Sequence, residues 1–308
     1  MMWKRMIGKL RYIGVLAFMA AGVCAGSAAT TYADAPAVSP AWRQAVQETA
    51  KANIREIEIH VAGEAPIVGA AYAKIQMHAD ATDRLQGVAD IAVFGAVNEQ
   101  FQIPFYGERK DRTYVFYYKL PEAVGGFWLK YAVPNVPVNT PLFQSRNEDY
   151  AARAREIEPH VFQVVYNRQS YERALTYMEK AQNDTPAVRN LSAAFDAVNL
   201  PAITLYVRVD PESRRIVHAE GDLTSQLPLL MQSLQPMLAR MKTPLAGYNL
   251  VQRALQQSKL CFFVTYHYGT PEPVTIPMTV KEQAKEIVAP QNQRRTQDFF
   301  GQVNRKSL

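Results

Sequence analysis

Cysteine is scarce in this 308-residue chain, which contains only Cys24 and Cys261. Because Cys24 lies in the signal peptide described below, Cys261 is left alone after cleavage and no intramolecular disulfide can form. The hydrophobic core alone must then stabilise the fold. Cys261 stands in the apolar run 260–264, where we expect it to be buried in a strand. A serine at this position is then expected to cost about 1 to 3 kcal/mol.

Catalytic motifs are also absent from the sequence. There is no Gly-x-Ser-x-Gly nucleophile elbow, no phosphate-binding glycine-rich loop and no His-Glu-x-x-His zinc motif. Acidic pairs such as Glu56 and Glu58 fall on an alternating polar face, which is typical of a solvated surface. The sequence therefore predicts a protein that is not an enzyme and has no cofactor, although a site built from dispersed residues stays open.

The N-terminus has a short apolar run but none long enough to cross a bilayer. Lys4, Arg5, Lys9 and Arg11 precede the run from Tyr12 to Val23, and small residues follow as far as Ala33. This order predicts a secretory signal peptide over residues 1–33. We therefore expect export to the periplasm or the extracellular face of the cell envelope, with no transmembrane segment after cleavage.

Two features of the termini qualify this expectation. Lipidation of Cys24 stays open, although Val23 is β-branched where lipoprotein signals carry a small residue. The formal net charge of the precursor is +6, but the signal contributes four basic residues and no acidic one, which leaves 30 basic against 28 acidic. So small an excess predicts no nucleic-acid partner. The polar tail over residues 289–308 is expected to be disordered.

A period of two dominates the first half of the mature chain, after a helix expected at 41–52. Apolar residues alternate with polar ones in six segments: Ile57, Ile59 and Val61; Ile75 and Met77; Ala89, Ile91 and Val93; Phe101, Ile103 and Phe105; Tyr114, Phe116 and Tyr118; Phe127, Leu129 and Tyr131. The connections leave no room for crossover helices, so the pattern predicts an antiparallel meander.

The second half of the chain mixes periods. Spacings of three and four predict a helical insertion over about 141–199, carried by Tyr150, Ala154, Ile157, Val161, Val164 and Val165. Strands are expected at 203–209 and 216–220 around a turn at Asp210, then a Met/Leu-rich helix at 225–241 and a strand pair at 260–268 and 274–279. Together these elements predict one α+β domain over 34–288, a strongly curved antiparallel sheet or half-open barrel with helices covering its concave face.

Three segments carry a resemblance to a known family. They are Gly126–Lys130, Val209–Val217 and Val274–Val280. They resemble landmarks of the lipoprotein-carrier superfamily, which includes periplasmic lipoprotein chaperones and mycobacterial lipid-carrying lipoproteins. The resemblance implies a half-open barrel that holds acyl chains against helices on its concave side.

The inner aromatic residues are the candidate ligand site. Acyl chains bind through non-directional burial, worth roughly 25 cal/mol per Å², so a carrier needs a broad apolar wall. The predicted wall consists of Phe105, Tyr114, Phe116, Tyr118, Phe127, Leu129 and Tyr131, with Met231 adding adaptability. We therefore expect an exported carrier or chaperone-like protein with an apolar or lipid ligand. Two alternatives stay open: an envelope interaction module with a packed concave face, and a hydrolase with an unrecognised site.

The histidines suggest one further arrangement. If the first hairpin turns at Gly69, His60 and His78 become cross-strand neighbours, with Glu58 and Asp80 as the next pair. Such a set is able to bind zinc or copper, but two histidines on a polar face are more often merely solvated. The sequence therefore predicts no metal site, and it places His267 on the surface.

Overall fold

One sheet contains every strand of the described chain. The computed structural model describes residues 38–66, 69–80, 82–95, 98–111, 113–122, 125–133, 150–170, 172–173, 202–227 and 256–286. The strands are β1 (Ile54–Ala65), β2 (Gly69–Ala79), β3 (Leu85–Gly95), β4 (Glu99–Lys110), β5 (Thr113–Lys119), β6 (Trp128–Val133), β7 (Arg153–Glu158), β8 (Val161–Tyr166), β9 (Ile203–Val209), β10 (Ile216–Asp222), β11 (Lys259–Tyr268) and β12 (Lys285–Glu286). The described helices are α2 (Pro40–Ala50), the 3₁₀ turn η2 (Thr224–Gln226) and α7 (Met278–Gln283).

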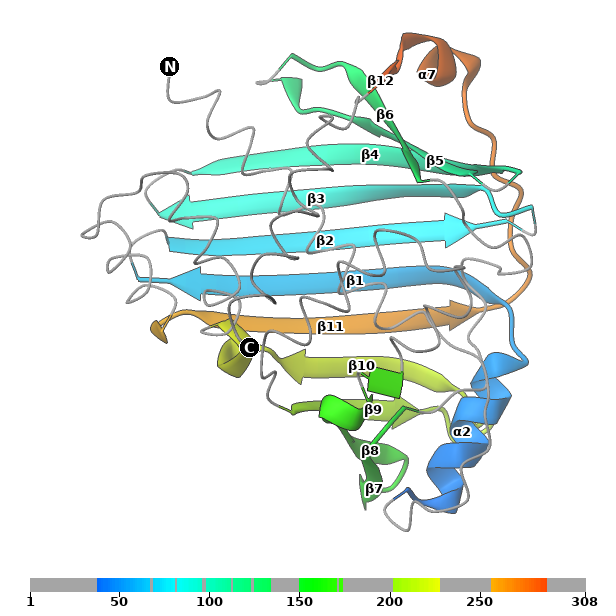
Figure 1. The fold of residues 1–308 in the computed structure, drawn as a ribbon, viewed down its shortest axis with the longest axis vertical. Coiled ribbons are helices and arrows are strands. Elements are labelled where there is room, and N and C mark those ends of the chain that lie inside the picture. The colour runs from blue at the N-terminus through cyan, green and yellow to red at the C-terminus, as the bar shows by residue number, and fades with distance from the viewer. Residues whose placement is uncertain are drawn as a thin grey trace, which may run out of the picture.

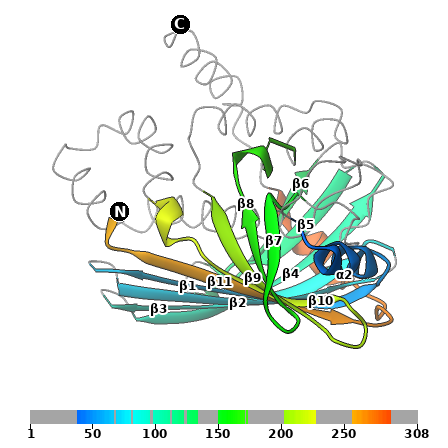
Figure 2. The same cartoon turned by 90° about the horizontal axis from the view of Figure 1, so that it is seen from below.

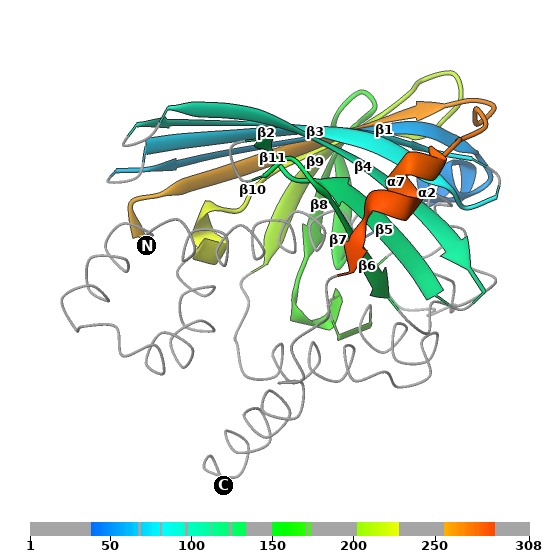
Figure 3. The ribbon, with the colours of Figure 1, turned by 90° about the horizontal axis from the view of Figure 1, so that it is seen from above.

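The sheet is open, strongly curved and almost wholly antiparallel. Its 12 strands run in the order β12-β6-β5-β4-β3-β2-β1-β11-β10-β9-β8-β7 (Figure 1), and only the β12–β6 pair is parallel. Figures 2 and 3 show β5–β6 and β7–β8 bending out of the plane of the central strands on the same side. The curved open sheet and the β1–β6 meander predicted from the sequence are thus confirmed.

Several sequence predictions concern residues outside the described ranges. These are the signal peptide, the domain limits at 34 and 288, the polar tail, Met231 and nearly all of the helix expected at 225–241. A helical cover over the concave face therefore stays a prediction. No helix in the described ranges is long and apolar enough to cross a membrane.

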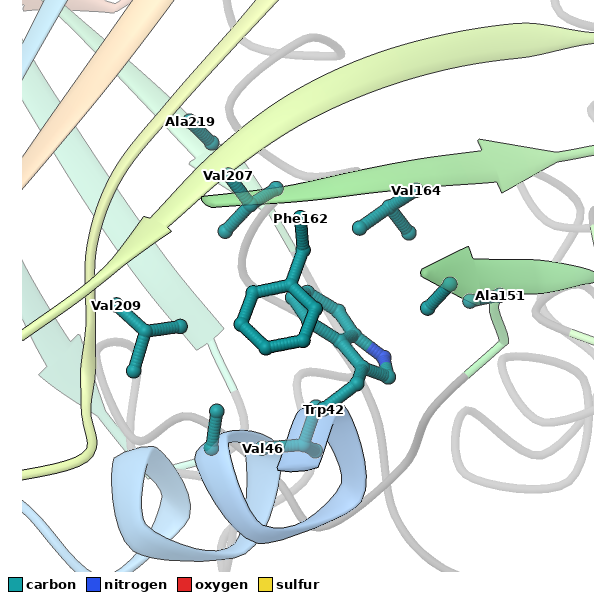
Figure 4. Close-up of a cluster of buried hydrophobic side chains, with 10 residues drawn as sticks. Trp42, Val46, Ala151, Phe162, Val164, Val207, Val209 and Ala219 are labelled. Carbon is teal, nitrogen blue, oxygen red and sulfur yellow. The ribbon is translucent and has the colours of Figure 1, made fainter. Parts of the chain in front are cut away.

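The first helix matches its prediction closely and closes one end of the sheet. Ser39 caps α2 by accepting a hydrogen bond from the Trp42 backbone N–H at 3.2 Å, and Pro40 begins the helix. The Trp42 ring lies 5.6 Å from that of Phe162 on β8. Figure 4 shows both rings with Val46, Val207 and Val209, which belong to one buried cluster. This cluster fixes α2 against β7–β10.

The hairpin β7–β8 corrects the helix predicted around 150–166. Ala154 pairs with Val164, and Glu156 with Phe162. The alternation of apolar and polar residues was obscured because β7 is an edge strand with exposed charged residues on both of its faces. The β-branched run in β8, by contrast, favours a strand. Residues 168–170 and 172–173 are helical, and the remaining parts of the predicted helical insertion, 141–149 and 174–199, lie outside the described residues.

The segment after β11 also differs from its prediction. Val274 and Ile276 are buried and Thr275 is exposed, as in a strand, but residues 270–277 form no ladder and α7 begins at Met278. Their side chains pack against Tyr117 on β5, on the side of the sheet away from α2. The alternation of buried and exposed residues thus reflects burial on one side and not strand pairing. Pro271, Pro273 and Pro277 lack the N–H groups that a ladder needs, which disfavours pairing.

A buried carboxylate ties this strap, residues 274–284, to the sheet. The side chain of Glu108 is 7% exposed; it accepts a hydrogen bond from the Tyr117 hydroxyl at 2.9 Å and pairs with the Lys110 and Lys281 Nζ atoms at 3.0 and 2.5 Å. Burial raises the pKa of Glu108, but the hydrogen bonds from Lys281, Lys110 and Tyr117 outweigh burial and the pKa lies below its ordinary value. The ionised form therefore stabilises the strap.

This pairing predicts an acid-dependent contribution to stability. A carboxyl group whose pKa is lower in the folded than in the unfolded chain stabilises above the unfolded value and loses that contribution as pH falls through the folded one. We expect the melting temperature of the wild type to fall more steeply below pH 4.5 than that of Glu108→Gln, so that the two curves converge in acid. Thermal unfolding measured across this range checks it, and parallel curves would contradict the pairing.

Cys261 lies in a strand, as predicted, but its predicted burial is wrong. It is exposed on β11, in register with Ala62 and Asp222, while its neighbour Val264 is 2% exposed on the opposite face. The run 260–264 holds no polar residue, so its sequence did not show which side chains face inward. We now expect Ellman's reagent to titrate one thiol in the folded mature protein, and Cys261→Ser to change stability by less than about 0.5 kcal/mol. A thiol that reacts only in denaturant would contradict the exposed position.

Candidate functional site: the concave apolar surface

The strand register places apolar residues in continuous rows across one face of the sheet. One row crosses from β8 to β4 through Phe162, Val207, Ala219, Val264, Ile59, Ile75, Ala89 and Ile103. The next row, parallel to it, consists of Val164, Leu205, Gly221, Phe262, Val61, Ala73, Ile91 and Phe101. Since neighbouring strands lie about 4.8 Å apart, each row is roughly 34 Å wide. We call this face, on which α2 packs, the concave face.

The opposite, convex face is polar at the same positions along the strands. One row there consists of Tyr206, Glu220, Phe263, His60, Lys74, Asp90 and Gln102, all of which except Phe263 carry a polar group. Strands of period two present one solvated and one apolar face, as antiparallel sheets with a one-sided core do. The strap with α7 packs on this convex face.

Burial on the concave face is uneven. Val207, Ala219, Val264 and Ile59 are between 2% and 6% exposed, and α2 packs on part of this half. On the other half, most apolar residues of β2–β6 are only partly buried: Ile75, Met77, Ala89, Ile91, Ile103, Phe105, Phe116, Tyr118 and Leu129. Ala79, Leu85 and Tyr114 are buried. The first row is therefore packed core from Phe162 to Ile59, whereas the face over β2–β6 keeps accessible apolar surface.

The predicted aromatic wall lies on this partly buried half. Phe105, Tyr118 and Leu129 are in direct register across β4, β5 and β6, and Phe116 pairs with Tyr131. Tyr131 is 43% exposed. The structure thus brings together five of the eight residues that the sequence singled out.

Glycines allow two aromatic rings to lie flat on the sheet. A Cβ atom at Gly87 would lie 2.4 Å from Cζ of Phe105, and one at Gly107 would lie 2.7 Å from Cε1 of Tyr114. Both distances are far below any real carbon–carbon contact, so these rings need the glycines beneath them. Each ring thus fills the space that a side chain at the glycine would take.

Tyr114 differs from its predicted role. It is 1% exposed, its hydroxyl donates a hydrogen bond to the Asp83 carbonyl at 3.1 Å, and its ring lies 4.7 Å from that of Phe116. Nearby, Arg109 Nε pairs with Asp83 Oδ2 at 2.7 Å. Burial raises the pKa of Tyr114, which keeps the phenol neutral. Tyr114 therefore closes one end of the concave face and does not line accessible surface.

One further predicted residue, Phe127, lies apart from the wall. Phe127 stands just before β6, and the Lys285 Nζ atom lies 4.5 Å from the centre of its ring, so Phe127 packs against β12. Met231 is outside the described residues. The sequence did show Ile75, Ile91 and Ile103 as strand residues, but only the pairing register reveals that they continue the same surface.

The possible metal pair of the first hairpin does not form. Ala65 pairs with Gly69, so His60 lies opposite Lys74, and His78 lies opposite Glu56. Gly69 begins β2 and does not mark the centre of the turn. Among the described residues, no group of three or more His, Cys, Asp or Glu side chains is arranged to hold a metal ion. His267 is exposed, as predicted.

Comparisons with known proteins give a distant likeness of fold. No family model matches the chain, and no curated protein matches it. Among solved structures, the chain is similar to LprF from Mycobacterium bovis, with a TM-score of 0.33 and 11% sequence identity, covering 78% of this chain and 98% of that one. The likeness concerns the overall fold alone.

Proposed function

We propose that the protein is an exported, non-enzymatic carrier that binds an acyl chain or a similar apolar ligand on the concave face over β2–β6. The observation that carries this proposal is the set of partly buried apolar side chains there, which continues a row of side chains that is buried from Phe162 on β8 to Ile59 on β1. A contiguous apolar surface that keeps access in a folded protein commonly marks a binding site.

The dimensions and chemistry of this surface suit an acyl chain. β2 has 11 residues, which corresponds to roughly 37 Å of strand. Each buried methylene contributes about 0.8 kcal/mol, so a long chain gains enough to offset the cost of association without any directional contact. The wall offers this kind of contact through Ile75, Ile103 and Phe105, whose side chains carry no hydrogen-bonding group. A polar or ionic ligand would find no partner among them.

Export and the absence of catalysis are parts of the same proposal. Both rest on the sequence: the signal peptide predicted over 1–33 and the lack of a catalytic motif. A carrier that receives lipid in the envelope needs both properties. Its resemblance at the sequence level to the lipoprotein-carrier superfamily agrees with this assignment.

Titration with a fluorescent fatty acid tests the proposal. Delipidated mature protein is mixed with cis-parinaric acid, and fluorescence is followed to saturation. We expect one saturable transition that palmitate reverses by competition. A linear, non-saturable signal that palmitate leaves unchanged would contradict the proposal, because it would reflect partition onto a non-specific surface.

A further inference from the structure

Three side chains on the convex face form a hydrogen-bonded chain that the carrier function does not use. Tyr72 on β2 hydrogen-bonds through its hydroxyl to Nδ1 of His60 on β1, and Nε2 of His60 hydrogen-bonds to Oε1 of Glu58. The strand register places them on the polar side of the sheet, opposite the concave apolar surface. They are therefore separate from the proposed ligand site.

The imidazole in the middle of this chain is held tightly. His60 is 9% exposed, and its ring stacks on Phe263 of β11 with centroids 4.1 Å apart and planes 15° from parallel. Glu58 is fixed in turn, since its Oε2 accepts a hydrogen bond from Gln76 at 3.0 Å and pairs with Lys74 at 3.1 Å. Contacts within the sheet thus hold both the imidazole of His60 and the carboxylate of Glu58 in place.

The hydrogen bonds assign the protons. Burial raises the pKa of Glu58, but hydrogen bonds from His60 and Lys74 outweigh it and lower the pKa, so Glu58 is an ionised carboxylate that only accepts. Nε2 of His60 therefore carries the proton that it donates to Glu58. In the neutral imidazole, Nδ1 is then the acceptor, and the Tyr72 hydroxyl donates to it. This is the order of nucleophile, base and orienting carboxylate found in catalytic triads.

We propose that Tyr72 is a nucleophilic phenol, activated by His60 as general base and positioned by Glu58, that accepts acyl groups from activated esters. The Tyr72 Oη atom bonds to the acyl carbon, while its proton passes to Nδ1 of His60. The ester C–O bond breaks, and the leaving oxygen takes the proton from His60. The products are O-acyl-tyrosine and an alcohol, with no change in oxidation state.

The surroundings of Tyr72 leave room for an ester. Tyr72 is 37% exposed, and Phe94 on the neighbouring strand is 54% exposed. Tyr72 pairs with Ala92, so Phe94 is its diagonal neighbour on the convex face, within reach of a group bound at Tyr72.

A second tyrosine on the same face provides an internal control. Tyr206 on β9 is 42% exposed and pairs with Gln163 and Glu220. Its diagonal neighbour His218 faces Thr265 with Nδ1 and Glu220 with Nε2, and not Tyr206. The mature protein is treated briefly with p-nitrophenyl acetate, and peptide mass spectrometry measures acetylation of both tyrosines. A positioned general base typically contributes 10²- to 10⁴-fold, so we expect Tyr72 to be acetylated at least about tenfold faster than Tyr206.

Variants then assign the roles. His60→Phe keeps an aromatic ring beside Phe263 and is expected to bring the Tyr72 to Tyr206 ratio close to one. Glu58→Gln keeps a hydrogen-bond acceptor but removes the charge, and it should lower the ratio partway. Because both tyrosines belong to one molecule, a general loss of stability would not produce a selective fall at Tyr72. Equal acetylation of the two tyrosines in the wild type, or a ratio unchanged in His60→Phe, would overturn the proposal.

Discussion

Phe116→Asp is expected to weaken binding of a fluorescent fatty acid at least about tenfold, a loss of roughly 1.4 kcal/mol or more, while leaving the far-ultraviolet CD spectrum intact. Phe116 lies on β5 in register with Gly107 and Tyr131, on the half of the concave face that keeps accessible apolar surface. A carboxylate there stays hydrated, so the fold tolerates it. It removes apolar contact and places a charge against the acyl chain.

Phe94→Asp is the matched control for this experiment. It makes the same substitution in the same meander, but Phe94 is 54% exposed on the convex face. We expect its affinity for the fatty acid to stay within about twofold of the wild type, because surface substitutions change little. Unfolding by Phe116→Asp would show that this half of the concave face is packed core. Equal affinities for the two variants would place the ligand elsewhere.

Tyr114→Ala is expected to destabilise the protein by about 3 to 5 kcal/mol, the usual cost of removing a large buried aromatic ring. The ring of Tyr114 covers Gly107 and contacts Phe116, and alanine would leave the space above the glycine empty. For a domain of this size the change corresponds to a fall in melting temperature of roughly 6 to 20 °C. Thermal unfolding followed by CD measures it.

Two variants separate the ring from the hydroxyl. Tyr114→Phe keeps the ring and loses only the hydrogen bond to Asp83, so we expect a cost of about 1 kcal/mol. Tyr131→Ala removes an equal ring from a position that is 43% exposed and should cost less than about 1 kcal/mol. If Tyr114→Ala lowered the stability no more than Tyr131→Ala, Tyr114 would not be the core residue that its burial indicates.

Strands were the part of the fold that the sequence predicted best. Ile57, Ile59 and Val61 alternate with charged residues, and the structure places them in β1, because one-sided burial produces a period of two. The same reasoning failed at Val274 and Ile276, where the strap is buried on one side without a strand partner. It failed again over 153–166, because an edge strand with exposed charges on both sides hides its alternation.

The pairing register of the strands could not be predicted from sequence periodicity. A glycine at position 69 suggested the centre of a turn. In the structure Ala65 pairs with Gly69, so each β1 residue on the convex face has a different β2 partner from the predicted one. His60 therefore meets Tyr72 and not His78. For the candidate site, the aromatic residues of β4–β6 were foreseen individually. Their continuity with Ile75 and Ile103 depends on pairings between strands that no local pattern records.

Burial likewise depends on contacts between distant segments. Tyr114 and Phe116 have the same parity in β5 and similar apolar character, yet Tyr114 is 1% exposed and Phe116 is only partly buried. The difference in burial comes from two distant residues. Gly107 on β4 leaves space for the ring of Tyr114, and the carbonyl of Asp83, before β3, accepts the hydrogen bond from its hydroxyl. A single strand pattern cannot separate a wall residue from a core residue.

Native mass spectrometry of the mature protein, purified without detergent from its own envelope, tests the central claim most directly. If the concave surface over β2–β6 holds acyl chains, we expect a population whose mass exceeds that of the polypeptide by one lipid, and organic extraction should release this lipid and return the protein to its bare mass. Phe94→Asp should retain the adduct and Phe116→Asp should lose it. A wild-type protein that carries no extractable lipid and binds none when lipid is supplied would contradict the carrier function and favour a packed interaction module.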